Sequence, residues 1–107
     1  MDVIGIDLGG TNIKAGIIND KGVIKHKKTV PTPVQGGREG IKTALANIIS
    51  ELNIISPKPL AVGIGSAGRI DRHTGTVIFA TDNLPGWMGT NVKTELETLC
   101  GLPVFVE

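Results

Sequence analysis

Short apolar runs separated by glycine or polar turns dominate the first thirty residues. The run at residues 3–8 stops at Gly9-Gly10, residues 13–18 are apolar again, and residues 22–30 follow an Asn-Asp-Lys-Gly turn signal. This pattern predicts three strands joined by short turns, and therefore an antiparallel meander. Lysines at 25, 27 and 28 indicate that the third strand is a solvated edge.

Helical periodicity begins after Pro31 and Pro33. Apolar residues recur at helical spacing along one stripe, at Ile41, Leu45, Ile48, Leu52 and Ile55. We expect an amphipathic helix that ends at Pro57 and Pro59. The apolar run at residues 60–64 then predicts a parallel strand that is buried on both faces and reached by a crossover connection.

The last third of the chain repeats this alternation. Residues 76–80 predict a short strand, and residues 104–106 predict a final one. Between them lies a helix that begins at Thr90 or Asn91, ends at Gly101, and presents one apolar side made of Val92, Leu96, Leu99 and Cys100. The order predicts an α/β fold, a mixed sheet whose first three strands are antiparallel and whose later strands are parallel with crossover helices. No linker divides residues 1–107, so we expect one domain.

Charge and composition narrow the classes of function. Eleven Lys and Arg against ten Asp and Glu give a net charge of +1, which gives no support to a nucleic-acid or membrane-surface partner. The single cysteine favours a reducing compartment, and neither a secretory leader nor a membrane span is apparent in the sequence. We therefore expect a cytoplasmic protein that acts on small molecules.

Two common nucleotide motifs fit the sequence poorly. Residues 5–11 resemble a P-loop but place Thr11 where its lysine belongs, and they join two strands instead of a strand and a helix. Gly63, Gly65 and Gly68 match the dinucleotide fingerprint, and Asp82 lies near the expected acidic position. However, a hydrophilic, hairpin-like stretch follows Gly68 where the fingerprint requires a helix. A module that binds NAD(H) remains an alternative hypothesis.

The first glycine cluster suggests a different phosphate site. Backbone amides of a hairpin turn at Gly9, Gly10, Thr11 and Asn12 can bind anions where no Cβ blocks their approach. Asp7, at the end of the first strand, would repel a nucleotide unless a magnesium ion (Mg2+) lay between them. Thr11 adds a hydroxyl and Lys14 a positive charge. The simpler alternative is a plain turn in which Asp7 and Lys14 face solvent.

Four successive segments resemble the motifs of the ROK-family sugar kinases in order and spacing: DLGGTNIK, GIGSAGRID, NLPGW and LPVFVE. The resemblance implies a ribonuclease H-like fold similar to those of actin and hexokinase, with residues 1–107 as the N-terminal lobe of a two-lobe kinase. It also implies that Asp7 is the magnesium-side carboxylate and that residues 9–12 hold the phosphates of ATP. Gly68 and Asn83 would contact sugar hydroxyls, with Thr81 in the same loop. Many members have proline where Ala67 stands.

The same resemblance implies where the chain is incomplete as a catalyst. The family's last strand reads V-x-x-E-N-D, and its aspartate is the general base, whereas this sequence ends at Glu107. We therefore expect the chain to be inactive alone. The expected parent is a homo-oligomer that phosphorylates a hexose with ATP, first of all glucose at its 6-hydroxyl; N-acetylmannosamine, N-acetylglucosamine and fructose compete with glucose.

Several alternatives stay open from the sequence. A sugar-sensing ROK regulator would share these motifs, although such members carry a helix-turn-helix ahead of the first strand, and a non-catalytic lobe that serves assembly is a further possibility. Trp87 either stacks on a sugar or fills the core of its loop, and we favour the second. His26 and His73 are expected at the surface.

Overall fold

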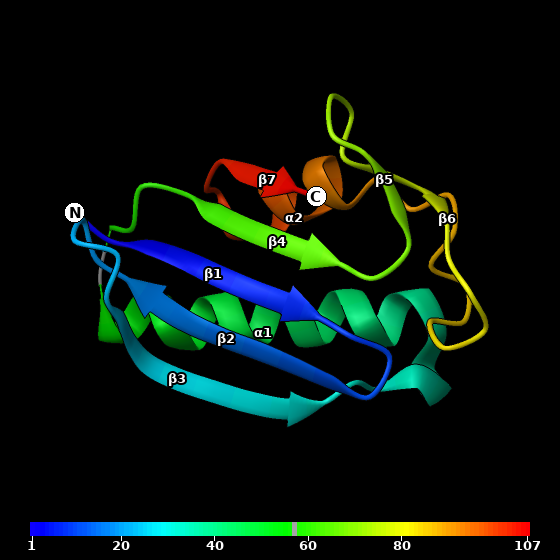
Figure 1. Cartoon of the computed structure of the whole chain (residues 1–107), viewed down its shortest axis with the longest axis horizontal. Coiled ribbons are helices and arrows are strands. Elements are labelled where there is room, and N and C mark those ends of the chain that lie inside the picture. Colours follow the sequence, from blue (N-terminus) through cyan, green and yellow to red (C-terminus); the bar gives the residue numbers. More distant parts are fainter. Residues whose placement is uncertain (57) are drawn as a thin grey trace.

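The computed structural model describes residues 1–56 and 58–107, and its centre is a five-stranded sheet with the order β3-β2-β1-β4-β7 (Figure 1). The strands of this sheet are β1 (Val3–Leu8), β2 (Asn12–Ile18), β3 (Ile24–Pro31), β4 (Val62–Ser66) and β7 (Val104–Val106). Strand β1 pairs antiparallel with β2, β2 pairs antiparallel with β3, and the β1–β4 and β4–β7 pairs are parallel. The predicted meander, the solvated edge strand and the later parallel strands are confirmed.

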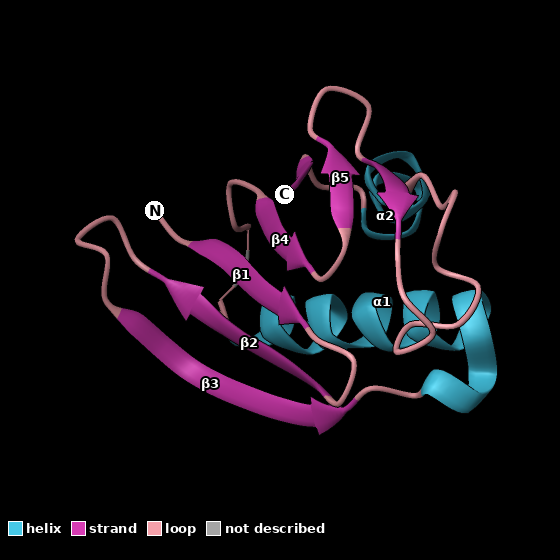
Figure 2. Ribbon diagram, turned by 45° about the vertical axis from the view of Figure 1, so that its right-hand side comes forward, coloured by secondary structure: helices cyan, strands magenta, loops and turns pink. Residues whose placement is uncertain are grey.

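Two helices cover one face of this sheet, as Figures 1 and 2 show. Helix α1 (Gly37–Ile55) follows a short 3-10 turn, η1 (Val34–Gly36), and helix α2 is Val92–Cys100. Their buried side chains join one core with alternate residues of the strands, among them Ile4, Ile6, Ile13, Leu45, Leu52, Leu96 and Val104. Burial of such side chains contributes about 1.5–3 kcal/mol each, so this face supplies most of the stability.

The predicted ends of α2 are confirmed, whereas the predicted apolar stripes extend one residue too far in α1 and are interrupted in α2. The Asn91 side chain accepts a hydrogen bond from the amide of Thr94 at 3.0 Å, and Gly101 adopts a left-handed φ of 72°, so both predicted ends of α2 are confirmed. The predicted apolar stripes are wrong at Ile55 and Leu99, which are 51% and 55% exposed. Both lie in the last turn of their helices, and Leu99 lines a shallow cavity beside Ile49 of α1. Pro57 lies outside the described residues.

Strand β4 corrects a second expectation. It begins at Val62, two residues later than predicted, and Leu60 is 51% exposed. Val62 and Ile64 are buried against the helices, whereas Gly63 and Gly65 are exposed on the opposite face. The run is therefore buried on one face and not on both, because neither helix of the described residues lies over the glycine side.

A separate two-stranded hairpin, β5 (Arg69–Asp71) and β6 (Thr76–Phe79), leaves the sheet directly after β4. Strand β6 is one residue shorter than predicted. The described part of the chain contains no helix both long and apolar enough to span a bilayer.

Glu97 connects α2 to the final strand and should make this junction sensitive to acid. Its carboxylate accepts hydrogen bonds from the Val104 amide at 3.0 Å and from Lys93 Nζ at 3.1 Å, and these interactions lower the pKa of Glu97. A lowered pKa stabilises the fold above the unfolded-state pKa, and the stabilisation is lost as the pH falls through the folded-state value. The melting temperature should therefore fall between about pH 5 and pH 3. In Glu97→Gln that fall should be shallower, and an equally steep fall would contradict the assignment.

Candidate functional site

The carboxyl ends of the parallel strands meet at one edge of the sheet, the usual place for a ligand in α/β folds. The amide of Ala67, just after β4, donates to the carbonyl of Leu8 at the end of β1 at 3.0 Å. The amide of Ser66 donates to the carbonyl of Glu107, just after β7, at 2.7 Å. In Figure 1 the arrowheads of β1, β4 and β7 point toward this edge. The predicted phosphate turn and the Gly68 turn thus start from neighbouring strands.

A backbone hydrogen bond closes the turn between β1 and β2. The amide of Gly9 donates to the carbonyl of Asn12 at 3.0 Å, so Gly10 and Thr11 form the tip. The amide of Gly9 is therefore engaged within the turn itself. Thr11 and Asn12 are exposed, as a site for an external ligand requires.

A short segment after β3 fixes this turn from outside. The hydroxyl of Thr32 donates to the carbonyl of Gly9 at 2.7 Å, and its amide donates to the carbonyl of Thr11 at 2.9 Å. Thr32 is only 7% exposed. The sequence analysis missed this residue, although its place between Pro31 and Pro33, which restrict the backbone, was a usable signal.

Gly10 brings the turn into contact with the predicted sugar loop. A Cβ at this position would lie 2.8 Å from Cβ of Asn83, closer than side chains pack. Neither Gly9 nor Gly10 has a positive φ, so the turn conformation does not require glycine here. Because Gly10 has no side chain, Asn83 can approach it closely. Asn83 itself is exposed.

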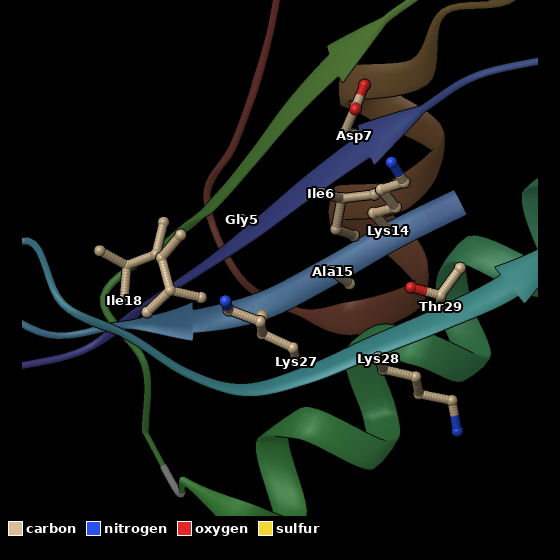
Figure 3. Close-up of a pocket in the computed structure, with 11 residues that line it drawn as sticks. Gly5, Ile6, Asp7, Lys14, Ala15, Ile18, Lys27, Lys28 and Thr29 are labelled. Carbon is tan, nitrogen blue, oxygen red and sulfur yellow. The ribbon is translucent and has the colours of Figure 1, made fainter. Parts of the chain in front are cut away.

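Asp7 and Lys14 face each other across β1 and β2 on the sheet face opposite the helices. They contribute to a pocket of about 370 Å³ whose walls include Gly5, Gly16, Lys27 and Thr29 (Figure 3). The described residues that line it include none of residues 9–12, 68, 81 or 83. The structure thus places Lys14 beside Asp7 and away from the tip of the turn.

The surroundings of Asp7 are compatible with a magnesium ion. Among the described residues no group of three His, Cys, Asp or Glu side chains could hold a metal, so Asp7 would be a single carboxylate ligand. It is exposed, and in residues 1–56 and 58–107 it forms no ion pair that would compete. Mg2+ commonly keeps several waters and takes one or two carboxylates, so this donor set fits.

Gly68 is required by its own backbone. Its φ is +99°, and a Cβ there would lie 2.3 Å from the carbonyl oxygen of Phe79. The chain continues from Gly68 into β5, while Gly63 and Gly65 lie within β4. The dinucleotide alternative is therefore wrong, because a strand stands where its phosphate-binding helix would begin.

The loop of residues 81–90 carries the other predicted sugar residues. Thr81 and Asn83 are exposed, and the carbonyl of Thr81 accepts a hydrogen bond from the amide of Leu84 at 3.0 Å. Trp87 is fully buried, and its Nε1 donates to the hydroxyl of Ser66 at 3.1 Å. Trp87 therefore fills the core of the loop as expected, and Ser66 is a partner that the sequence did not reveal.

Comparison with known proteins tests the family resemblance over the whole chain. The ROK family model matches residues 3–107. A glucokinase of Thermotoga maritima is 38% identical over 107 residues, which are 100% of this chain and 33% of that protein. An N-acetylmannosamine kinase of Escherichia coli is 31% identical over 98% of this chain and 35% of its own length.

A solved structure agrees with these relatives. The ROK glucokinase from Streptomyces griseus, in complex with glucose and AMPPNP, superposes with a TM-score of 0.88 at 36% identity, over 100% of this chain and 33% of that one. The chain thus spans about a third of the length of the proteins it matches. The expected actin-like α/β fold is confirmed. On its motifs, its fold and this match, the chain belongs to the ROK family.

Proposed function

We propose that the protein containing this chain transfers the γ-phosphoryl group of ATP to a hexose, and that residues 1–107 are the N-terminal lobe of a two-lobe enzyme. The observation that carries the proposal is the contact between Gly10 and Asn83, since it brings the turn of residues 9–12 directly against the loop of residues 81–90. Phosphoryl transfer depends on positioning donor and acceptor together, and this contact provides such a position.

Each predicted residue then has a distinct task. The amides at the tip of the turn, in Gly10 and Thr11, hold the phosphate chain, and Asn12 adds a polar group beside them. Lys14 adds a positive charge beside Asp7. Asn83 both donates to and accepts from vicinal hydroxyls of the sugar, and Thr81 stands in the same loop. The turn at Gly68 offers backbone groups to the sugar from the end of β4.

Asp7 would hold Mg2+ through water, and that ion would neutralise charge on the transferred group. A carboxylate beyond Glu107 would accept the proton of the sugar hydroxyl, since β7 ends beside β4 at this same edge. Closure of a second lobe would exclude water, which would otherwise accept the phosphoryl group. We expect this enzyme to work in the cytoplasm and as a homo-oligomer.

Glucose is the proposed substrate and its 6-hydroxyl the proposed acceptor. Support comes from the Thermotoga relative, a glucokinase, and from the glucose complex of the Streptomyces griseus enzyme. The relative named as an N-acetylmannosamine kinase supports that sugar as the competing candidate.

A sugar panel tests this proposal on the full-length protein. ADP release should be measured with glucose, 6-deoxyglucose, fructose, N-acetylglucosamine and N-acetylmannosamine. We expect the highest kcat/KM with glucose and no turnover of 6-deoxyglucose, which lacks the acceptor oxygen. ADP release that no sugar raises above the sugar-free rate would refute the kinase assignment. Turnover of 6-deoxyglucose would refute the 6-hydroxyl alone.

A further inference from the structure

Arg38, in the first turn of α1, joins the start of that helix to the sugar loop. Its Nε donates to the carbonyl of Gly86 and its Nη2 donates to the carbonyl of Met88, each at 2.9 Å. One planar guanidinium thus holds two carbonyls of the loop, which is the bidentate geometry that arginine provides and lysine does not.

The backbone of the loop lies directly against this arginine. A Cβ at Gly86 would be 3.4 Å from the amide nitrogen of Arg38, and one at Gly89 would be 3.6 Å from its Nη2. The two glycines have φ values of +73° and +87°. The loop therefore turns its carbonyls toward Arg38 through conformations that favour glycine.

Other contacts also hold the loop. Trp87 is buried and bonded to Ser66, and the amide of Gly89 donates to the carbonyl of Val77 at 2.7 Å. Asn83 lies before all of these attachments and is exposed. Its position relative to Gly10 therefore depends both on the buried Leu84 beside it and on how the segment that follows is fixed.

Arg38 is also close in sequence to the residue that fixes the phosphate turn. Thr32 forms hydrogen bonds with the carbonyls of Gly9 and Thr11. It lies six residues before Arg38, and η1 connects the two. Residues 32–38 thus contact the phosphate turn at one end and the sugar loop at the other. A shift of either contact would change the separation between the two half-sites.

We propose that Arg38 is a positioning residue for sugar binding, which fixes the loop of residues 81–90 so that Asn83 stays against the phosphate turn. This inference rests on the proposed kinase function. A displacement of about 1 Å at a reacting centre can lower the rate by up to about 100-fold, so an arginine that touches no substrate can still influence catalysis.

The test uses the full-length protein with Arg38→Met and Arg38→Lys, and Lys42→Met as the matched control. Lys42 lies one turn later on α1 and bonds to Glu39 and Glu95, so its loss removes a cationic helix contact without touching the loop. For Arg38→Met we expect the sugar KM to rise about tenfold, while the ATP KM changes less than about twofold. Arg38→Lys should restore little of the sugar KM, because one ammonium cannot replace the guanidinium fork.

Hydrogen exchange of the peptide that covers residues 81–91 supplies a readout that does not need activity. We expect faster exchange in both Arg38 variants and an unchanged rate in Lys42→Met. Faster exchange with an unaltered sugar KM would overturn the positioning role, as would slow exchange in Arg38→Met. If the wild-type protein phosphorylates no sugar, the proposed function fails. Independently of that result, unaltered exchange of residues 81–91 in the Arg38 variants would overturn the contact between Arg38 and the loop.

Discussion

Replacement of Asp7 by alanine in the full-length protein is expected to lower kcat for sugar phosphorylation by about 100-fold or more. The carboxylate stands at the end of β1, directly before the turn that we assign to the phosphates. Without it, the turn would retain its amides but would lose its only assigned link to Mg2+. The measurement is the rate of sugar-dependent ADP release as a function of Mg2+ concentration, and Asp7→Asn should need more Mg2+ than the wild type.

Asp7→Ala should lose activity without losing its fold. Asp7 is exposed and forms no ion pair within the described residues. The melting temperature of Asp7→Ala should therefore stay close to that of the wild type. Asp20→Ala is the matched control, because Asp20 is an exposed aspartate in the next turn and pairs only with the N-terminal amine at 3.5 Å among the described residues. Full activity in Asp7→Ala would remove Asp7 from the magnesium site.

Substitution of Gly68 by alanine is expected to destabilise the fold by more than about 3 kcal/mol. Two effects add at this position. The φ of +99° is strained for any residue with a side chain, and the new Cβ would lie 2.3 Å from the carbonyl oxygen of Phe79. The chain must then pull β6 away from β5 at the point where the hairpin leaves the sheet. Urea unfolding of the full-length protein measures the effect.

Gly22→Ala separates these two effects. Gly22 has a similar φ of +80°, but a Cβ there would meet nothing within 4 Å. Its cost should be about 1 kcal/mol, from the backbone conformation alone. Equal costs at Gly22 and Gly68 would mean that the chain relieves the contact with Phe79, and the structural requirement for glycine at 68 would then be limited to φ.

The sequence predicted both helices and every strand except β5 because their signals are local, whereas β5 was read only as part of a hydrophilic, hairpin-like stretch. The stripe from Ile41 to Leu52, the Asn91 cap and the Gly101 stop each act within a few residues of the chain. The ends of the helices were harder to predict. Ile55 and Leu99 continue the apolar periodicity, but only the packing of the folded chain determines whether such residues are covered.

The candidate site divides in the same way. The sequence motifs predicted Asp7, the glycine turn and Asn83 as site residues, since each segment carries a recognisable local pattern. Only the structure revealed that Thr32, Ser66 and Arg38 hold these segments. Their partners lie more than twenty residues away in sequence, and a threonine, a serine and an arginine carry no periodicity that marks such a partner.

The sequence by itself determined the family, the order of both helices and of every strand except β5, and the residue types available for phosphate and sugar. The tertiary structure decided that Gly10 is small to admit Asn83, that Gly68 is fixed by Phe79, and that the amide of Gly9 is engaged within its own turn. The physical reason is that chemistry belongs to single residues and short motifs, whereas close approach depends on segments that only the folded sheet brings together.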